Sequence, residues 1–417
     1  MKIQKPPPPF IAKYVIKLHF FLSRVADKVL PQYYQLMFQS IGAMSSFTIH
    51  LAARLNIADH LITGSKDISE LVQLTKTDEA SLLRFMRALS FLGVFKEKPL
   101  GFFSLTSRGR LLCEDNDPSI KPLALLMGRE AWFDSWANIE HSIKTGESSF
   151  RAMFGKGYFE YQKSNKEERE LFDLWMKQGA FANSPAIAWR YPFGRFNKVV
   201  DIGGGTGHLI RTILHAHPNV KEGVCFDMPE VIALAEEDNQ LGNRYKTIGG
   251  DFFDEVPSAD LFIMHQIIHD WDDERCMCIL RNLHRSLSEN GRVLIVEAVL
   301  RPGSLDDFYQ LLDLQMLILS DGGRERTFEE FSDILDKSGF KLNRCIATGS
   351  AFSILEVIKN KDLQIYFRNK NNRSSGAPCR RHNYTGRDAF SFYTPQEWPS
   401  SHFHSPQYDR ANHKPCH

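Results

Sequence analysis

The chain has 417 residues, and 43% of them are hydrophobic, which suits a globular protein of two or three domains and excludes a fibre or a wholly disordered chain. Its 51 Lys and Arg residues balance 50 Asp and Glu residues, so we expect no general attraction to nucleic acid or to an anionic membrane, and a small organic partner instead. Seven cysteines lie scattered without paired spacing, which favours a reducing compartment such as the cytoplasm.

Residues 1–30 are expected to form an N-terminal extension with an amphipathic helix. Its most apolar stretch, residues 11–25, is interrupted by Lys13, Lys17 and Arg24. Such a stretch is too short and too charged for a membrane span, and it has no cleavage-site pattern. We therefore predict no membrane association.

The pattern of residues 31–125 predicts helices followed by a β-hairpin, which is the order of a winged-helix domain. Thr77 is the expected N-cap of the second main helix. A winged helix suggests DNA binding, but the helix that would enter the groove, residues 81–92, carries only Arg84 and Arg87 among apolar residues. We therefore predict a packing or dimerisation role and no nucleic-acid partner.

Residues 126–190 are predicted to be helical and rich in aromatic side chains, as expected of a linker and a lid over an organic substrate. A protein core would need the same side chains, so both interpretations stay open. The residues expected to form the substrate pocket are Trp132, Phe133, Trp136, Phe172, Trp175, Met176 and, from the following domain, Met316.

From residue 191 to residue 359, short apolar strands alternate with helices. This pattern predicts an α/β domain with a mostly parallel sheet, helices on both faces and a hairpin at the sheet edge. In the motif VVDIGGGTGHL, Gly203 and Gly205 let the backbone turn after the first strand and approach a ligand closely. A nicotinamide dehydrogenase would need a third glycine where His208 stands, while the glycine falls at Gly207, which disfavours that enzyme.

Acidic residues follow the next two strands of this domain. Asp227 ends the second strand, where a carboxylate can accept hydrogen bonds from both hydroxyls of a ribose. Asp251 and Phe252 follow the third strand and suit the amino group and the ring face of an adenine. Each Asp alone could simply cap a helix. Their recurrence at successive strand ends predicts a nucleoside cofactor site.

A histidine and two glutamates are expected at the same rim of the sheet. His269 lies just beyond the fourth strand, where it can take a proton from a substrate oxygen. Glu297 closes the fifth strand and Glu325 lies in a later loop, so either can orient the imidazole. Taken singly, Glu325 could instead form a surface ion pair with Arg324 or Arg326.

The chain resembles the small-molecule O-methyltransferases related to plant caffeate and animal acetylserotonin enzymes and to bacterial polyketide and carotenoid methyltransferases. The resemblance runs from about residue 32 to residue 359 and is carried by VVDIGGGTGHL, FDMPEV, GDFF, IIHDWDDE, LIVEAVL and GGRERTFEEF, in this order. It implies a Rossmann-like class I methyltransferase domain preceded by a winged-helix-like dimerisation domain. It also implies a homodimer.

The resemblance assigns roles to the rim residues. His269 would be the general base for a hydroxyl, flanked by Glu297 and Glu325, with Asp270 beside the substrate. Methyl transfer from a sulfonium is an in-line displacement that needs no metal, so we expect none. The residues implied to bind S-adenosylmethionine are Gly203, Gly205, Asp227, Asp251, Phe252 and, beside the adenine, Trp271.

Two positions depart from the pattern of many plant members. His265 stands where they have Lys, and Ser320 stands for an Asn of the substrate loop, which argues against plant phenylpropanoid substrates. Two other hypotheses stay open: a different reaction with the same cofactor (N-methylation, decarboxylation, hydroxylation or ring closure), and a non-catalytic winged-helix regulator. Residues 360–417 have no counterpart in the family, and their composition predicts disorder.

Overall fold

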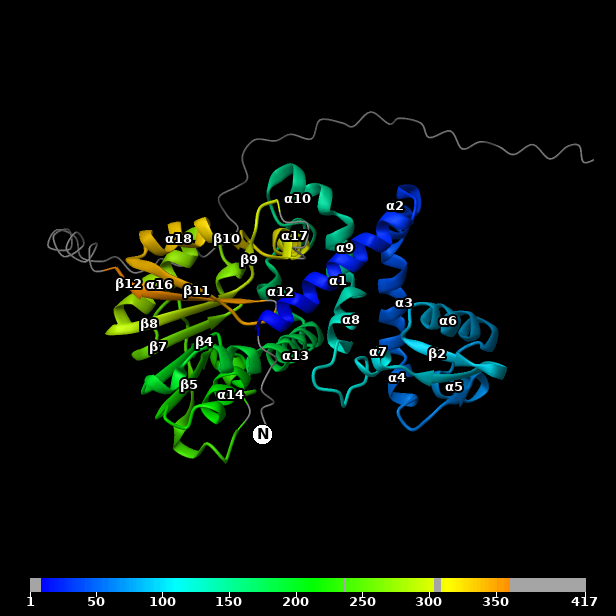
Figure 1. Cartoon of the computed structure of the whole chain (residues 1–417), viewed down its shortest axis with the longest axis horizontal. Coiled ribbons are helices and arrows are strands. Elements are labelled where there is room, and N and C mark those ends of the chain that lie inside the picture. The colour runs from blue at the N-terminus through cyan, green and yellow to red at the C-terminus, as the bar shows by residue number, and fades with distance from the viewer. Residues whose placement is uncertain (1–8, 236, 304–308, 351, 361–417) are drawn as a thin grey trace, which may run out of the picture. The chain divides into compact units, whose positions relative to one another are not determined.

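The computed structural model describes residues 9–235, 237–303, 309–350 and 352–360 (Figure 1). The prediction of disorder over residues 360–417 falls, apart from Asn360, outside these residues. Within the described part of the chain, no helix combines the length and the apolar character that crossing a membrane requires.

The N-terminal part folds into helices around a small antiparallel sheet of order β1-β3-β2. Helices α1 (Pro9–Val29) and α2 (Gln32–Ser40) precede it in the chain, and its own helices are α3 (Gly42–Arg54), α4 (Ile57–His60), α5 (Ile68–Thr75), α6 (Glu79–Phe91) and α7 (Ser107–Arg110). Its strands are β1 (Lys66–Asp67), β2 (Phe95–Lys98) and β3 (Phe102–Leu105). Helix, helix and hairpin thus occur in the predicted winged-helix order. The core of this part includes Leu71, Leu82, Met86, Leu89 and Phe103, all fully buried.

Side chains at the helix starts explain where α5 and α6 begin. Asp67 and Glu70 form a capping box at α5, because each side chain accepts a hydrogen bond from the backbone of the other. The predicted N-cap of α6 is wrong by one residue: Asp78, rather than Thr77, accepts the backbone N–H of Ser81 at 2.9 Å. The hydroxyl of Thr77 instead shares a hydrogen bond with the hydroxyl of Thr75 at 2.8 Å.

Six helices connect this part to the large sheet. They are α8 (Lys121–Met127), α9 (Glu130–Ala137), α10 (Ile139–Thr145), α11 (Ser149–Phe154), α12 (Tyr158–Ser164) and α13 (Lys166–Arg190). Their aromatic side chains share a core with α17 (Tyr309–Leu319), in which Trp132, Phe150 and Ile318 are buried together. Gln315 of α17 accepts a hydrogen bond from the Trp136 indole at 2.5 Å. The connecting helices are therefore packed against a segment that lies much later in the chain.

The large sheet has seven strands in the order β11-β12-β8-β7-β4-β5-β6. Its strands are β4 (Lys198–Ile202), β5 (Glu222–Asp227), β6 (Tyr245–Gly249), β7 (Ala259–His265), β8 (Leu287–Glu297), β11 (Phe340–Ala347) and β12 (Ser353–Lys359). The five strands from β4 to β8 are parallel, and β11 and β12 add the predicted antiparallel edge hairpin. A separate parallel pair joins β9 (Val299–Leu300) to β10 (Arg326–Thr327).

Helices cover both faces of this sheet, as the alternating pattern predicts (Figure 1). They are α14 (His208–Ala216), α15 (Pro229–Ile232), α16 (Asp273–Ser286) and α18 (Phe328–Lys337), together with the end of α13. One buried cluster joins the sheet to α16 and α18, and the other joins it to α13 and α14. Because parallel strands share one carboxyl edge, the segments after β4, β5, β6, β7 and β8 meet along that edge.

Candidate active site

The glycine loop after β4 turns on residues with left-handed backbone conformations. Gly203 has φ +67° and Gly205 has φ +58°, a region that residues with a Cβ rarely adopt. A Cβ at Gly203 would lie 2.3 Å from Ile267, whereas a Cβ at Gly205 would meet nothing within 4 Å. At Gly203 the loop therefore packs closely against Ile267. At Gly205 it is open, so its backbone can contact a ligand there.

Asp227 at the end of β5 is tied to this loop. Its two carboxylate oxygens accept the backbone N–H of Gly205 at 2.8 Å and of Met228 at 2.7 Å. Burial raises the pKa of Asp227, and these two donors oppose the rise by favouring the carboxylate. The remaining acceptor capacity of the carboxylate lies beside the open part of the loop, which suits a polyhydroxyl group such as a ribose.

A second acid, which the sequence places in the glycine motif without indicating a role for it, lies beneath the loop. Asp201 is fully buried at the end of β4, and burial together with the charge of Asp227 raises its pKa to about 8. A Cβ on Gly204 would lie 3.1 Å from its Oδ2. Asp201 therefore packs against the loop from below, and its position at the end of a buried strand was the available signal.

Aromatic rings gather at the neighbouring strand end. Phe252 and Trp271 meet edge to face at 6.1 Å, and Phe253 meets the same indole at 4.8 Å. Asp251 accepts the backbone N–H of Phe253 at 2.9 Å, which fixes the turn that carries these rings. The cofactor residues expected from the sequence are thereby brought to one edge of the sheet. Their glycine, carboxylate and ring groups fit a nucleoside.

His269 lies in the 3-10 turn Ile268–Asp270 beyond β7 and is buried among three carboxylates. Its Nδ1 is 2.9 Å from Oε1 of Glu325 and 3.8 Å from Oε2 of Glu297, and its Nε2 is 3.6 Å from Oδ1 of Asp270. Oε1 of Glu297 also accepts the backbone N–H groups of Ile267 and Ile268, each at 2.9 Å. Glu297 therefore holds the loop that carries the imidazole, while Glu325 holds the imidazole itself.

The carboxylates dominate the electrostatics of this cluster. Burial alone lowers the pKa of His269, but the charges of Glu297, Asp270 and Glu325 raise it to about 10. Burial raises the pKa of Glu297 to about 7 and that of Asp270 to about 6. The cluster can hold or release a proton near neutral pH, which is what an acid–base site requires.

The same cluster resembles a set of metal ligands in composition. His269, Glu297 and Glu325 offer ligand atoms that lie within 4.8 Å of one another. The short contact between Nδ1 of His269 and Glu325, however, leaves each of these two atoms engaged with the other. This contact favours a proton-sharing role for the three side chains.

Two arginines next to Glu325 have different surroundings. Arg324 pairs with Asp273 and Glu330 at the surface. The surface ion pair that the sequence allowed between Arg324 and Glu325 is therefore replaced by these two pairs. Arg326 is fully buried and donates to the carbonyls of Ile268 at 3.0 Å and Trp271 at 2.8 Å. Arg326 thus holds both ends of the turn that carries His269, a role that its sequence position did not indicate.

Replacing Arg326 by Met should destabilise the protein by on the order of 3 kcal/mol, because the carbonyls of Ile268 and Trp271 would lose a charged donor at about 1–3 kcal/mol each and Asp273 would lose its buried partner. Replacing the half-exposed Arg324 by Met should cost less than about 1 kcal/mol, as for a surface ion pair. Urea unfolding of both variants measures the difference. Equal losses would contradict the role assigned to Arg326.

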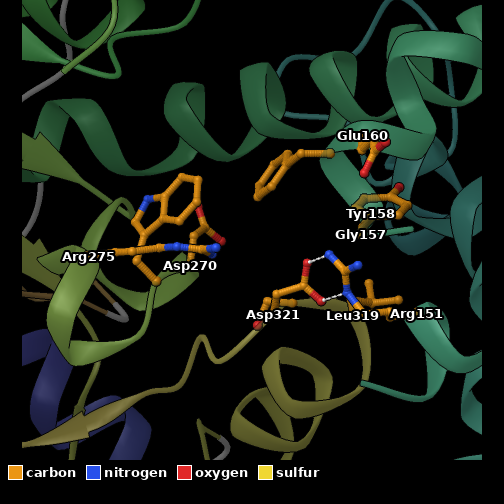
Figure 2. Close-up of a pocket in the computed structure, with 11 residues that line it drawn as sticks. Arg151, Gly157, Tyr158, Glu160, Asp270, Arg275, Leu319 and Asp321 are labelled. Carbon is orange, nitrogen blue, oxygen red and sulfur yellow. Dashed lines mark hydrogen bonds and ion pairs between the residues drawn. The ribbon is translucent and has the colours of Figure 1, made fainter. Parts of the chain in front are cut away.

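A cavity of about 170 Å³ opens beside this turn (Figure 2). Asp270 and Trp271 form one wall, and Phe159 stacks on Trp271 at 6.1 Å. Ser320 and Asp321 form another wall, where Asp321 accepts a two-point ion pair from Arg151 (Figure 2). Sequence reasoning missed that ion pair, which joins residues 170 positions apart.

The structure places the residues predicted to contact substrate in different surroundings. Asp270 and Ser320 line the cavity, and the Ser320 hydroxyl donates to the carbonyl of Met316, one turn earlier, at 2.6 Å. Trp132 is buried in the helical core, where its indole donates to the Tyr158 hydroxyl at 2.8 Å. Neither Trp132 nor Met176 lines this cavity, and Met176 is 37% exposed on α13.

The sheet order, the glycine loop after β4, the acid that ends β5 and the buried histidine beyond β7 define a Rossmann-like methyltransferase of class I. A family model described as the O-methyltransferase domain matches residues 136–341, and one described as the O-methyltransferase dimerisation domain matches residues 37–115. The chain belongs to this O-methyltransferase family, whose methyl donor is S-adenosylmethionine. The predicted resemblance, fold class and cofactor are thereby confirmed.

Individual relatives agree with this assignment. The chain is 37% identical over 313 residues to a phenazine O-methyltransferase (PhzM) of Lysobacter antibioticus, covering 74% of this chain and 91% of the relative. The crystal structure of LaPhzM matches 79% of this chain and 100% of its own, with 36% identity and a TM-score of 0.75. The O-methyltransferase NcsB1, solved with S-adenosylmethionine and 2-hydroxy-5-methyl naphthoic acid, matches 76% of this chain and 96% of its own at 28% identity and TM-score 0.64.

Proposed function

We propose that this enzyme transfers the methyl group of S-adenosylmethionine to a hydroxyl on an aromatic ring of a small, largely apolar molecule, with His269 as general base. The observation that carries the proposal is the 2.9 Å contact between Nδ1 of His269 and Glu325, beside the glycine loop. Because Nδ1–H donates to Glu325, Nε2 is the nitrogen left to accept a proton from the substrate. Glu297 orients the turn that carries the imidazole.

The residues of the site divide the work of the reaction. S-adenosylmethionine, when bound, supplies an electrophilic methyl group on a sulfonium. Gly203, Gly205, Asp227, Asp251 and Phe252 are proposed to bind it, with Trp271 beside the adenine. His269 takes the hydroxyl proton at Nε2 while Glu325 and Glu297 stabilise the imidazolium that forms. The side chains then need only to align oxygen, methyl and sulfur, and no metal is required.

The acceptor is proposed to lie between Asp270 and the end of α17. Asp270 and Ser320 line the cavity and offer polar contacts, and Met316 supports Ser320 from the preceding turn. Trp132 is proposed to shape the wall from behind, and Met176 to approach from the helical lid. The name of the phenazine relative supports a planar, fused aromatic acceptor. The rings of Phe159 and Trp271 give this cavity aromatic surface, and its polar side chains can orient such a molecule.

We propose that residues 1–359 are organised in four parts. An N-terminal extension (1–30) precedes a dimerisation domain (31–125), a linker and lid (126–190) and the catalytic domain (191–359). The dimerisation family model supports a homodimer over a DNA-binding regulator. The cytoplasmic location, expected from the scattered cysteines, stays a prediction.

The proposal is tested with the purified chain, S-adenosylmethionine and a matched pair of acceptors, 1-hydroxyphenazine and 1-aminophenazine, followed by a wider panel of hydroxylated aromatics. Mass spectrometry should find a methyl ether together with an equal amount of S-adenosylhomocysteine. Methylation of the amine alone, or S-adenosylmethionine binding without product from any hydroxylated aromatic, would overturn it.

The pH profile tests the link between Glu325 and His269. A raised pKa keeps His269 protonated at neutral pH, and only the neutral imidazole can act as a base, so kcat/KM should rise with pH toward the pKa of His269. Glu325→Gln removes one of the charges that raise this pKa, so the rise should move to lower pH by about one to three units. Exposed Glu329 in the first turn of α18 provides the control: Glu329→Gln should leave the profile unchanged. A profile that stays in place in Glu325→Gln would contradict the contact's role.

A further inference from the structure

Helix α1 presents a regular apolar stripe to solvent. Ile11, Val15, Leu18, Leu22, Val25 and Val29 follow one another at spacings of four, three, four, three and four residues. At about 100° per residue, these six positions fall within about 80° of the helix circumference. Their exposed fractions range from 43% to 82%. Among the described elements, α2 is the one that packs against α1 at more than isolated points.

This spacing suits the pairing of two helices. Apolar positions that alternate at three and four residues form the seam along which paired helices contact each other. The stripe runs for about 27 Å along α1, at about 1.5 Å per residue over 18 steps. Tyr14 and Phe21 flank it on one side and are also exposed. A stripe of this length and regularity is suited to packing against a second helix.

Exposed apolar positions at the same spacings occur again on α3, in the part of the chain that the dimerisation model covers. That model begins at residue 37, within α2, so α1 lies outside it. On α3, Met44, Phe47 and Leu51 follow one another at three and four residues and are exposed as well. The stripe on α1 therefore directly precedes, in the sequence, a dimerisation domain that also exposes apolar side chains.

We propose that α1 pairs with α1 of a second copy of this chain and so extends the dimer beyond the dimerisation domain. A twofold axis places the same surface of both copies together, so one self-complementary stripe is sufficient to form the contact. Pairing removes the six apolar side chains of each copy from water, which favours association. This inference rests on the homodimer proposed above, and its test distinguishes the failure of one from the failure of the other.

Adjacent residues on α1 provide a matched pair of variants. Leu22 lies on the stripe, and Ser23 lies about 100° away from it. Leu22→Lys and Ser23→Lys add the same charge, but only the first places it in the seam. Sedimentation equilibrium of the full chain should show a dimer dissociation constant at least about tenfold higher for Leu22→Lys and little changed for Ser23→Lys. Circular dichroism of both variants checks that they fold.

A second measurement applies if the dimer is too tight to dissociate. The photocrosslinking residue p-benzoylphenylalanine, placed at position 22 or at position 23 of the full chain, reports what lies beside each position. We expect a covalent dimer from position 22, with the linked peptides both derived from residues 9–30, and much less from position 23. Crosslinks from position 22 to other elements, or none to a second copy, would overturn the pairing.

The other possible results distinguish the pairing of α1 from its alternatives. Equal dissociation constants for the two variants, without a crosslink between the two α1 helices, would leave a dimer formed through residues 37–115 alone. A monomeric wild-type chain would overturn the homodimer together with this inference. Cosedimentation with phosphatidylcholine–phosphatidylglycerol vesicles that Leu22→Lys abolishes, without any effect on the dimer, would make α1 a membrane-surface helix instead.

Discussion

Replacing His269 by Ala should lower kcat by about 10²- to 10⁴-fold, the usual contribution of a positioned general base. The side chain is buried against Glu325 and Glu297, whose contacts fix its ring and leave one nitrogen for the substrate proton. S-adenosylmethionine should still bind, because Asp227 holds the glycine loop through Gly205 and Met228, and no hydrogen bond or ion pair in the described part of the chain joins this loop to the imidazole. Steady-state kinetics with the hydroxylated acceptor, together with calorimetric titration of the cofactor, measure the two effects separately.

His60 provides the control for this variant. It ends α4 in the N-terminal part, and His60→Ala should leave both kcat and cofactor affinity unchanged. A loss of less than about tenfold in His269→Ala would show that alignment of the reactants carries the rate. It would then favour one of the other reactions that the same cofactor pocket can support. A joint loss of activity and cofactor binding would instead indicate that the turn beyond β7 had collapsed.

The cofactor rim could be predicted from the sequence because its signals are local. Gly203 and Gly205 indicate a turn that only glycine adopts readily, and Asp227 ends a buried strand. Parallel strands share a carboxyl edge, so residues at successive strand ends must meet there. The same argument placed His269 and Glu297 together, since each follows a strand of this sheet.

The rest of the site depends on packing between distant segments, which periodicity does not specify. Glu325 reaches His269 across 56 positions, and the sequence alone equally allowed a surface ion pair. Arg326 is a buried charge, and such residues are rarely expected inside a protein. Trp132 was expected in the substrate pocket, but it lies in the core, where its indole donates to Tyr158. An aromatic residue suits both places, so the sequence alone does not distinguish them.

Replacing Asp227 by Asn should weaken S-adenosylmethionine binding by about 100-fold. Hydrogen bonds to a charged group contribute about 1.5–3 kcal/mol each, and tenfold in affinity corresponds to about 1.4 kcal/mol. The carboxylate does two things at once: it holds the open glycine loop through Gly205, and it keeps acceptor capacity for the two ribose hydroxyls. An amide retains one acceptor oxygen but presents an NH₂ donor where the second acceptor was, so it can satisfy one of these functions and not both.

Calorimetric titration of the cofactor into wild type, Asp227→Asn and Glu222→Gln measures this effect. Glu222 begins the same strand at its opposite end, where it pairs with Lys198 and Lys246, so its neutralisation should leave affinity unchanged. Because burial raises the pKa of Asp227, wild-type affinity should also fall on acidification at a higher pH than an ordinary carboxyl would predict, as the carboxylate is lost. Unchanged affinity in a folded Asp227→Asn variant would mean that the ribose is held elsewhere, and it would remove the rim after β5 from the cofactor site.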